Sequence, residues 1–576
     1  MPDLLARARA FHDADFDPET RAELAACIDA AERGEPAALA DLEDRFRGPL
    51  EFGTAGLRGV LGAGETRMNR AVVVRTTAGL AMYLKAAGLD GRGVVLGRDG
   101  RRGSATFADD AAAVLAAAGI RVWLFPDVVP TPLVSYAVRT LGAGAGVMVT
   151  ASHNPPEYNG YKAYAANSAQ IVPPIDTDIA NAIAKAPAAR VVPRMDLDEA
   201  RALGLVREPD PKVLEGYYAA VLALSRRNEG RTDLRVVYTP MHGVGDRYVH
   251  EVMRRFGFGR VVSVPEQSAP DGEFPTVRFP NPEEPGALDL AIALAKKEQA
   301  HVLLANDPDA DRLAVAVPDG DRWVQLSGNE VGVLLAHYLL TDDPSPAEHR
   351  LAVTTIVSSP LLGLVCKALG VRYAETLTGF KWIANTAMRL EQEHGCAFVM
   401  GYEEALGYSL GTVARDKDGV SAVAIFAEFV ASLRARGETV LGRLEAIYRR
   451  FGLVVSRQHN VTRKGLDGAA AIKAQMGVMR KSPPTAFGTE KVLAVRDYLD
   501  TAATGLPSSD VLTFDLGGGS RVTMRPSGTE PKVKYYFDVV EPLHEGEPFA
   551  DGRSRATARL DALEKEFVHV AKAALG

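Results

Sequence analysis

The sequence contains few cysteines, and they are irregularly spaced. Only Cys27, Cys366 and Cys396 occur among 576 residues. This spacing excludes a CxxC motif and a disulfide framework, and it is typical of proteins from a reducing compartment. We therefore expect a cytoplasmic protein that folds around hydrophobic cores without covalent cross-links.

Long apolar runs and concentrated positive charge are also missing. The most apolar stretch, residues 111–125, is interrupted by Arg121 and is too short to span a bilayer. The charged N-terminal region lacks the apolar segment of a signal peptide. The net charge is −7, and the 66 Lys and Arg residues form no basic stripe of the kind that nucleic-acid binding requires. We expect no membrane partner and no nucleic-acid partner.

What the sequence does contain is a long alternation of strand and helix patterns. Its 576 residues suggest about four domains. Residues 1–50 predict two amphipathic helices, with Pro18 and Gly34-Glu35-Pro36 as breaks. From about residue 70 to 450, short β-branched runs alternate with Ala- and Leu-rich helical stretches. This alternation predicts largely parallel sheets covered by helices.

Pairs of strands recur along this region. Residues 94–97 precede 147–149, residues 236–238 precede 302–305, and residues 353–356 precede 398–401. In each pair the second strand runs into a polar loop. Because ligands gather at the carboxyl ends of strands in open α/β sheets, the repeat predicts three sheets whose loops face one cleft.

The pattern changes after about residue 455. Residues 511–514 and 521–524 flank Gly517-Gly518-Gly519, which predicts a hairpin, and residues 554–575 predict a closing helix. The predicted fold class is α/β, with three similar α/β domains of mixed, largely parallel sheets and a smaller C-terminal α+β domain around a central cleft. The predicted domains are residues 1–205, 206–325, 326–455 and 456–576.

The most specific motif is Asp307-Pro308-Asp309-Ala310-Asp311-Arg312, directly after the apolar strand at 302–305. Three carboxylates crowded at the end of a buried strand favour a bound cation, and hard oxygen ligands favour Mg²⁺ or Ca²⁺. An EF-hand is excluded because its Gly and Glu positions hold Arg312 and Pro318. A magnesium site with positions open to substrate oxygens is typical of phosphoryl transfer. The alternative is a solvated acidic turn.

A second motif, Thr150-Ala151-Ser152-His153-Asn154-Pro155, also follows a strand. No GxSxG elbow surrounds Ser152, so an acyl-transfer hydrolase is not favoured. The hydroxyl of Ser152 can instead carry a phosphoryl group, whose negative charge needs a nearby metal. Lys162 follows ten residues later and could take or give a proton at the same site. The alternatives are an ordinary serine turn and a solvated surface lysine.

A third motif, Arg525-Pro526-Ser527-Gly528-Thr529-Glu530-Pro531-Lys532, combines a guanidinium, two hydroxyls and a glycine-containing turn. These groups suit a phosphate, although a plain basic turn is the alternative. Because the motif lies far along the chain from Ser152, it predicts a substrate held at both ends.

Three weaker loops complete the set of candidates. The Gly-rich loop at 52–59 carries Arg58 and could approach a phosphate closely. The loop at 376–382 carries Thr378 and Lys381. The paired carboxylates Glu403 and Glu404 could act as acid and base, accept hydrogen bonds from sugar hydroxyls, or lie in solvent.

Taken in order along the chain, these motifs resemble the α-D-phosphohexomutase superfamily over nearly the whole sequence. The similarity is greatest to its phosphoglucomutase/phosphomannomutase branch and, within it, to the phosphopentomutase-like enzymes. The matching segments are residues 52–59, 150–155, 307–312, 376–382, 403–407, 415–419 and 525–532.

The resemblance implies a role for each matching residue. Ser152 is expected to be the phosphoserine and to bind Mg²⁺ through its phosphate, together with Asp307, Asp309 and Asp311. Residues expected to stabilise charge or move protons beside it are Arg58, His153 and Lys162. Residues expected to contact the sugar phosphate or its bisphosphate are Arg312, Thr378, Lys381, Glu403 and Lys417. The group expected to clamp the distant phosphate is Arg525, Ser527, Gly528 and Thr529.

The implied activity is interconversion of hexose 1-phosphate and hexose 6-phosphate, on glucose or mannose, with glucose 1,6-bisphosphate as activator. Many relatives have Ser where this chain has Ala405. One hydrogen bond to a ring hydroxyl is therefore either missing or supplied by another group, and the identity of the sugar stays open. The alternatives are a phosphopentomutase on ribose or deoxyribose 1-phosphate, a glucose 1,6-bisphosphate synthase, and an inactive phosphosugar sensor. The protein is expected to be a monomer or a homodimer that binds small sugar phosphates.

Overall fold

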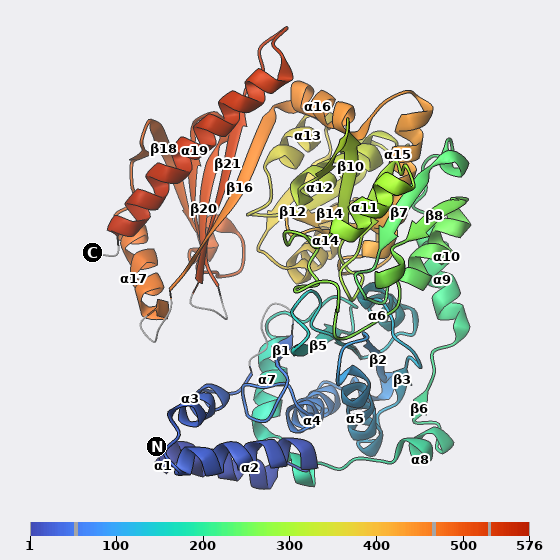
Figure 1. The fold of residues 1–576 in the computed structure, drawn as a ribbon, viewed down its shortest axis with the longest axis vertical. Helices are drawn as coiled ribbons and strands as arrows, with labels where there is room; N and C mark the ends of the chain where they lie inside the picture. Colours follow the sequence, from blue (N-terminus) through green and yellow to red (C-terminus); the bar gives the residue numbers. More distant parts are fainter. Residues whose placement is uncertain (1, 51–55, 464–467, 528–531, 575–576) are drawn as a thin grey trace. The chain divides into compact units, whose positions relative to one another are not determined.

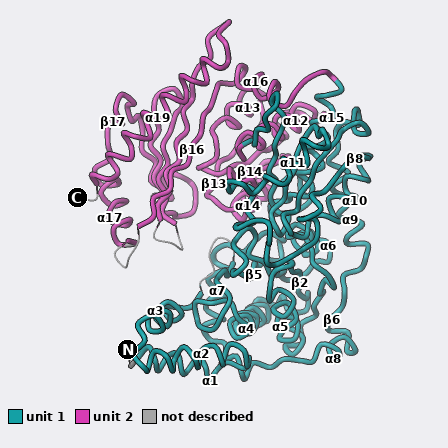
Figure 2. The backbone as a smooth tube through the Cα atoms, in the orientation of Figure 1, with its two compact units in different colours: residues 1–326, 407–435 teal, residues 327–406, 436–576 magenta. Residues whose placement is uncertain are grey.

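The computed structural model describes residues 2–50, 56–463, 468–527 and 532–574. The chain forms two compact units (Figure 2). Unit 1 comprises Met1–Leu326 and Gly407–Ala435, and unit 2 comprises Ser327–Leu406 and Arg436–Gly576. No helix in the described ranges has the length and apolar character that crossing a membrane requires.

The N-terminal region of unit 1 consists of three helices, so the prediction of two was wrong. They are α1 Pro2–Ala14, α2 Pro18–Glu32 and α3 Pro36–Arg45 (Figure 1). Proline occupies the first turn of α2 and of α3, where its missing N–H is tolerated, so each predicted break begins a new helix. The Asp17 side chain caps α2 by accepting a hydrogen bond from Glu19 N.

The first sheet of unit 1 has the strand order β1-β5-β4-β2-β3-β6. Strands β2, β3, β4 and β6 are parallel, whereas β1 and β5 form an antiparallel pair at one side. The strands are β1 Leu57–Val60, β2 Val94–Arg98, β3 Val122–Leu124, β4 Ala145–Val149, β5 Tyr158–Ala165 and β6 Val206–Arg207. The accompanying helices are α4 Arg70–Ala86, α5 Ser104–Ala117, α6 Thr131–Thr140, α7 Ile175–Lys185 and α8 Leu197–Ala202.

The second sheet of unit 1 has the order β11-β10-β9-β7-β8, with β8, β7 and β9 parallel. Its strands are β7 Arg235–Thr239, β8 Arg260–Ser263, β9 Val302–Ala305, β10 Ala314–Asp319 and β11 Arg322–Gln325. The helices are α9 Pro211–Leu222, α10 Asp246–Phe256, α11 Asp289–Lys297 and the buried α15 Gly419–Ala435; the short strand β15 Gly407–Leu410 also belongs to this unit.

Unit 2 contains one parallel and one antiparallel arrangement of strands. In the first, β12 Arg350–Thr355 lies between β13 Arg372–Thr376 and β14 Ala397–Glu403. The accompanying helices are α12 Gly328–Thr341, α13 Leu361–Leu369, α14 Phe380–His394 and α16 Val440–Phe451.

The C-terminal sheet has the order β16-β21-β20-β19-β18-β17, all antiparallel. Its strands are β16 Leu453–Thr462, β17 Ala486–Phe487, β18 Glu490–Asp497, β19 Leu512–Leu516, β20 Arg521–Pro526 and β21 Lys532–Glu541; its helices are α17 Gly468–Lys481, α18 Thr501–Thr504 and α19 Phe549–Ala573. One face packs against α17 and α19 in a core of aromatic and aliphatic side chains. The predicted hairpin is confirmed as β19 and β20, and the predicted closing helix as α19.

The predicted repeat of strand pairs is confirmed. Strand β2 pairs in parallel with β4, β7 with β9, and β12 with β14. The described residues thus form three α/β domains and a C-terminal α+β domain, as predicted. The exact domain boundaries stay predictions.

Within unit 2, a buried arginine ties the C-terminal sheet to the neighbouring α/β domain. Arg521, on β20, is 4% exposed. Its guanidinium lies 2.9 Å from Glu375 Oε1 on β13 and 3.0 Å from Asp538 Oδ2 on β21. Burial works to lower the pKa of Arg521, but the two carboxylates outweigh it and raise that pKa.

We predict that Arg521→Met lowers the free energy of unfolding by about 3–5 kcal/mol, because the substitution leaves buried carboxylates without their counter-charge. The exposed pair of Arg389 with Glu393 provides the control. Arg389→Met is expected to change stability by less than about 1 kcal/mol. The free energy of unfolding of both variants is measured by urea unfolding followed by circular dichroism. Equally small effects in the two variants would show that Arg521 does not hold the two domains together.

Candidate active site

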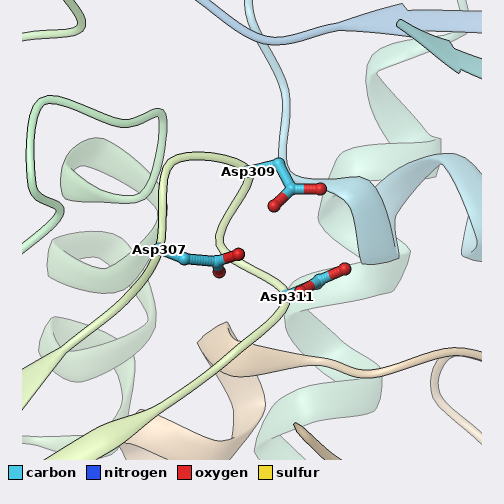
Figure 3. Close-up of side chains that lie close together, drawn as sticks. All are labelled: Asp307, Asp309 and Asp311. Atoms are coloured by element: carbon cyan, nitrogen blue, oxygen red, sulfur yellow. The ribbon is translucent and has the colours of Figure 1, made fainter. Parts of the chain in front are cut away.

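The loop between β9 and β10 gathers three carboxylates at the end of a buried strand. Asp307, Asp309 and Asp311 are each 0% exposed. One oxygen atom of each lies within 4.8 Å of the others, and Figure 3 shows the three side chains converging. Ala310 lies in the left-handed region at φ 53°, which turns the loop sharply between the second and third aspartate. The alternative of a solvated acidic turn is therefore wrong.

The donor set fits a divalent cation. Asp309 Oδ1 and Asp311 Oδ1 are buried and have no hydrogen-bond partner among the described residues. A buried carboxylate oxygen without a partner is unfavourable, and an ion that prefers oxygen ligands, such as Mg²⁺, satisfies it. The triad is thus able to bind a metal, as predicted.

The electrostatics of the loop show the repulsion that such an ion relieves. Burial, with Asp309 and Asp311 beside it, raises the pKa of Asp307 well above its ordinary value. Burial also works to raise the pKa of Asp309, but the Lys162 ammonium outweighs it and holds that pKa far below the ordinary value. The charge of the loop is therefore only partly balanced by the protein.

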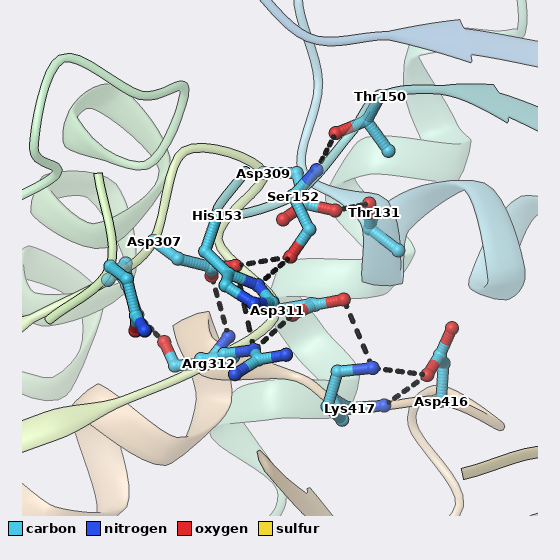
Figure 4. A network of polar contacts seen from close by, with 12 residues as sticks. Thr131, Thr150, Ser152, His153, Asp307, Asp309, Asp311, Arg312, Asp416 and Lys417 are labelled. Carbon is cyan, nitrogen blue, oxygen red and sulfur yellow. Dashed lines mark hydrogen bonds and ion pairs between the residues drawn. The ribbon is translucent and has the colours of Figure 1, made fainter. Parts of the chain in front are cut away.

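Ser152 lies beside this triad. It follows β4 and is 2% exposed. Its Oγ donates a 2.7 Å hydrogen bond to Asp307 Oδ2 and lies 3.2 Å from His153 Nδ1 (Figure 4). Its backbone is left-handed at φ 52°, and its N–H donates to Thr150 Oγ1 at 2.9 Å. Strained, non-glycine conformations of this kind concentrate at functional sites.

Cationic side chains surround the same point. Lys162 on β5 is 2% exposed, and its Nζ donates to Asp309 Oδ2 at 2.7 Å and to Asp311 Oδ2 at 2.9 Å. Lys417 Nζ lies 3.2 Å from Asp311 Oδ2, and Arg312 Nε lies 3.8 Å from Asp307 Oδ2. Lys162 is therefore no solvated surface lysine.

Arg58 and His153 complete the group in unit 1. Arg58, on β1, donates to Asn154 Oδ1 at 2.7 Å. Burial and the nearby Arg312 guanidinium lower the pKa of Arg58 to about 10. Burial and the same guanidinium lower the pKa of His153 well below its ordinary value. Arg312 and Arg58 thus place positive charge next to His153, and this charge favours an anion beside the imidazole.

The remaining predicted residues belong to unit 2. Glu403, at the end of β14, accepts a 2.6 Å hydrogen bond from Gly379 N, which fixes the bend that carries Thr378. Lys381 is 8% exposed, with its Nζ 5.4 Å from the Trp382 ring centre.

The predicted phosphate clamp is described only in part. Arg525 lies on β20, and Ser527 N donates to Lys532 O at 2.7 Å. Gly528 and Thr529 fall outside the described residues. The roles of all the unit 2 residues stay predictions.

Two buried groups that the sequence analysis did not select help to build the site in unit 1. Asp416 accepts hydrogen bonds from Tyr164 OH and Gln170 Nε2, each at 2.7 Å, and its Oδ1 lies 3.4 Å from Lys417 Nζ. Arg101 donates to the backbone of the Ser152 loop. Both follow strands in polar loops, and Asp416 also lies within the matching segment 415–419, so these two signals could have found them.

The comparisons with known proteins identify the family. Four consecutive segments match the phosphoglucomutase/phosphomannomutase family: alpha/beta/alpha domains I, II and III over residues 49–190, 215–320 and 327–451, and the C-terminal domain over residues 462–546. The chain belongs to the phosphoglucomutase/phosphomannomutase family. The resemblance stated from the motifs is confirmed.

Similar members of the family have different names. A Haemophilus influenzae protein described as a probable phosphomannomutase is 40% identical over 82% of this chain and 93% of its own length. The human phosphopentomutase is 36% identical over 92% of this chain and 90% of its own. The open form of the Paramecium phosphoglucomutase parafusin shares the fold, with a TM-score of 0.71 at 18% identity over 89% of this chain and 94% of its own.

Membership of the phosphoglucomutase/phosphomannomutase family makes this protein an enzyme, an intramolecular phosphotransferase of the isomerase class. The members of the family depend on Mg²⁺, in agreement with the aspartate triad of unit 1. The different names of the relatives leave the sugar unspecified.

We predict that Asp309→Asn lowers the affinity for Mn²⁺ or Mg²⁺ by more than about tenfold, because it removes one of three anionic ligands. Asp319→Asn changes an exposed aspartate on β10 and is expected to leave metal binding unchanged. Isothermal titration calorimetry of each variant decides. If Asp309→Asn bound the ion as tightly as the unsubstituted protein, the triad would not be the metal site.

Proposed function

We propose that this enzyme interconverts hexose 1-phosphate and hexose 6-phosphate, with glucose or mannose as the sugar, through a phosphorylated Ser152. The observation that carries the proposal is the 2.7 Å contact between Ser152 Oγ and Asp307 Oδ2, within a triad fit for Mg²⁺. A hydroxyl placed against a cation site and surrounded by cationic side chains suits a phosphoryl carrier.

In the proposed cycle, a free hydroxyl of the bound sugar phosphate attacks the phosphorus of phospho-Ser152. The phosphorus–Oγ bond breaks, the proton of the attacking hydroxyl passes by way of His153 or Lys162 to the released Ser152 Oγ, and a sugar 1,6-bisphosphate forms. The bisphosphate turns over and returns its other phosphoryl group to Ser152 Oγ. Glucose 1,6-bisphosphate restores the phosphoserine when it is lost, and so acts as the activator.

The side chains of unit 1 would serve this transfer by position and charge. Asp307, Asp309, Asp311 and the seryl phosphate would hold a Mg²⁺ ion, which would neutralise negative charge at the phosphoryl group. Lys162 and Lys417 keep Asp309 and Asp311 in place, through the contacts given above. Arg312 and Arg58 place positive charge beside His153 and Ser152, and this charge attracts an anion such as a phosphoryl group.

For unit 2, we propose that Glu403 accepts hydrogen bonds from sugar hydroxyls and that Thr378 and Lys381 contact the sugar phosphate. Arg525, Ser527, Gly528 and Thr529 would bind the phosphate that does not react. Arginine with a glycine turn and hydroxyls suits that task, because a guanidinium binds phosphate through two parallel hydrogen bonds. The free thiols of Cys27, Cys366 and Cys396 support a cytoplasmic location.

We predict that Ser152→Ala lowers mutase turnover by more than about a thousandfold, since the phosphoryl carrier is lost. The variant is also expected to take up no label from glucose 1,6-bisphosphate carrying ³²P. Ser268→Ala is the control, because the Ser268 hydroxyl donates to Pro265 O away from the triad. This variant should keep both the mutase turnover and the uptake of the ³²P label. Full turnover in Ser152→Ala would exclude the phosphoserine mechanism.

The second candidate is a phosphopentomutase acting on ribose or deoxyribose 1-phosphate. The similarity to the human phosphopentomutase over 92% of this chain favours it. Rates on glucose 1-phosphate, mannose 1-phosphate and ribose 1-phosphate, with the bisphosphate activator present, distinguish the two. Net production of a sugar bisphosphate from a phosphoryl donor such as 1,3-bisphosphoglycerate would indicate a bisphosphate synthase instead.

The residue at position 405 provides a test of sugar choice. Because a serine there could donate a hydrogen bond to a ring hydroxyl of a hexose, we predict that Ala405→Ser raises kcat/KM for glucose 1-phosphate relative to ribose 1-phosphate. One added hydrogen bond corresponds to a gain of up to about tenfold. Ala405→Val adds bulk without a donor and serves as the control. An unchanged ratio in Ala405→Ser would exclude residue 405 from sugar recognition.

A further inference from the structure

Arg101 is a fully buried cation that the proposed reaction does not use directly. It lies in the loop between β2 and α5, and its side chain is 0% exposed. Among the described residues, its guanidinium makes no hydrogen bond or ion pair with the aspartate triad or with the Ser152 hydroxyl, and it donates instead to backbone carbonyl groups of the loop that carries Ser152. Burying a charged group costs solvation free energy, so a buried arginine needs interactions that offset this cost.

The guanidinium gathers the carbonyl groups of the Ser152 loop. Arg101 Nη2 donates to Ser152 O at 2.6 Å and to Asn154 O. Arg101 Nη1 donates to Pro155 O at 2.8 Å and to Tyr158 O at 3.3 Å. These four acceptors lie along one turn of backbone, from the phosphoserine candidate to the start of β5. A planar fork of donors can hold such a set, whereas a single ammonium group cannot.

A buried carboxylate balances the charge of this arginine. Asp99 accepts a 3.0 Å hydrogen bond from Arg101 N and a 2.7 Å hydrogen bond from Ser104 Oγ. Its second oxygen lies 3.4 Å from Arg101 Nε. The carboxylate therefore lies against the Nε atom and the backbone of Arg101, while the two terminal nitrogens contact the Ser152 loop.

A loop of the second domain closes over the flat face of the guanidinium. The Phe274 ring centre lies 4.8 Å from Arg101 Cζ, and Phe274 is 2% exposed. The same loop approaches so closely that a Cβ on Gly272 would lie 2.9 Å from Gly100 O and 3.0 Å from Arg101 Cα. Both domains belong to unit 1, so Arg101 connects the Ser152 loop to the domain that carries the aspartate triad.

This arrangement bears on the strained backbone of Ser152. A non-glycine residue at φ 52° persists only where its surroundings determine it. The Ser152 carbonyl is held by Arg101, and the Ser152 N–H is held by Thr150 Oγ1. The two contacts fix both peptide groups of the residue and thereby direct Oγ toward Asp307.

We propose that Arg101 is a positioning residue for phosphoryl transfer: it holds Ser152 in the left-handed conformation from which Oγ reaches the metal loop. The Phe274 loop keeps the guanidinium in place from the second domain. This inference rests on the proposed function, because it takes Ser152 as the phosphoryl carrier. Arg101 acts through the Ser152 backbone and contacts no substrate.

The test compares Arg101→Lys with Arg102→Lys. Arg102 is the adjacent residue, with a side chain 53% exposed and paired to Glu273, and it serves as the matched control. Each protein is phosphorylated with glucose 1,6-bisphosphate, and transfer to the sugar phosphate is followed in a single turnover. Steady-state kcat and KM and the thermal unfolding midpoint are measured in parallel.

For Arg101→Lys we expect transfer and kcat to fall about a hundredfold while KM stays within about threefold, because a misplacement of about 1 Å at the reacting atom has an effect of that size. Arg102→Lys is expected to match the unsubstituted enzyme. In Arg101→Ala, methylguanidinium is expected to restore part of the transfer rate, which it would not do for a misfolded protein. Unchanged kcat in Arg101→Lys, or equal changes in kcat and KM without rescue, would overturn the proposal.

A second variant decides the matter if Arg101→Lys does not fold. Phe274→Leu removes the ring from the guanidinium face and leaves its hydrogen-bond donors intact. We expect a smaller fall in kcat, again with KM retained, and transfer at the unsubstituted rate would overturn the proposal. The unsubstituted enzyme separates the two hypotheses: if it forms no phosphoserine at residue 152, the proposed function fails first; if it does and these variants match it, only the role of Arg101 fails.

Discussion

The site in unit 1 depends on one constraint, the mutual repulsion among three buried carboxylates. One oxygen of each of Asp307, Asp309 and Asp311 lies within 4.8 Å of the others, away from solvent. Such a cluster is stable only where positive charge is supplied. Lys162 and Lys417 supply part of it, and one oxygen each of Asp309 and Asp311 has no hydrogen-bond partner among the described residues. The close approach of the three carboxylates destabilises the loop when no cation is present, and the same close approach makes the loop suitable for binding a divalent ion.

The fold brings the serine to this charge by a simple topological route. Ser152 and the aspartates each follow the second strand of a repeated parallel pair, β2 with β4 and β7 with β9. The two domains are joined at the same place by the hydrogen bond from Thr131 Oγ1 to Asp309 Oδ2, at 2.6 Å. Figure 4 shows this contact beside Ser152. Separate sheets thus contribute the hydroxyl of Ser152 and the three aspartates.

Much of this arrangement was predictable from the sequence. The alternation of strand and helix patterns gave the fold class, and seven ordered motifs gave the family. The prediction of two N-terminal helices was wrong because a proline at the first turn begins a helix as readily as it ends one. The proximity of Ser152 to Asp307 was predicted only by the resemblance to the family. The spacing of the two residues could not predict it, because residues 155 positions apart meet only through tertiary packing.

Other features of the site had no local signal. Nothing in the tripeptide Asp99-Gly100-Arg101 shows that its guanidinium will collect four carbonyl groups of a loop fifty residues away. The left-handed conformation of Ser152 could not be predicted from the sequence either, because serine has no preference for that conformation. Asp416 lies within a recognised motif, but its bonds to Tyr164 and Gln170 depend on a contact between distant segments. These groups hold Ser152 and the aspartate loop in place, and such contacts are decided by three-dimensional packing.

The central claim is that a seryl phosphate and a divalent cation share one site in unit 1. The most direct measurement is the ³¹P NMR signal of the phosphorylated enzyme during titration with Mn²⁺, a paramagnetic substitute for Mg²⁺. Our account predicts strong relaxation of the phosphoserine signal at one equivalent of Mn²⁺, and its loss when Asp309 is replaced by Asn. A phosphoserine signal that stays sharp while Mn²⁺ binds would contradict it.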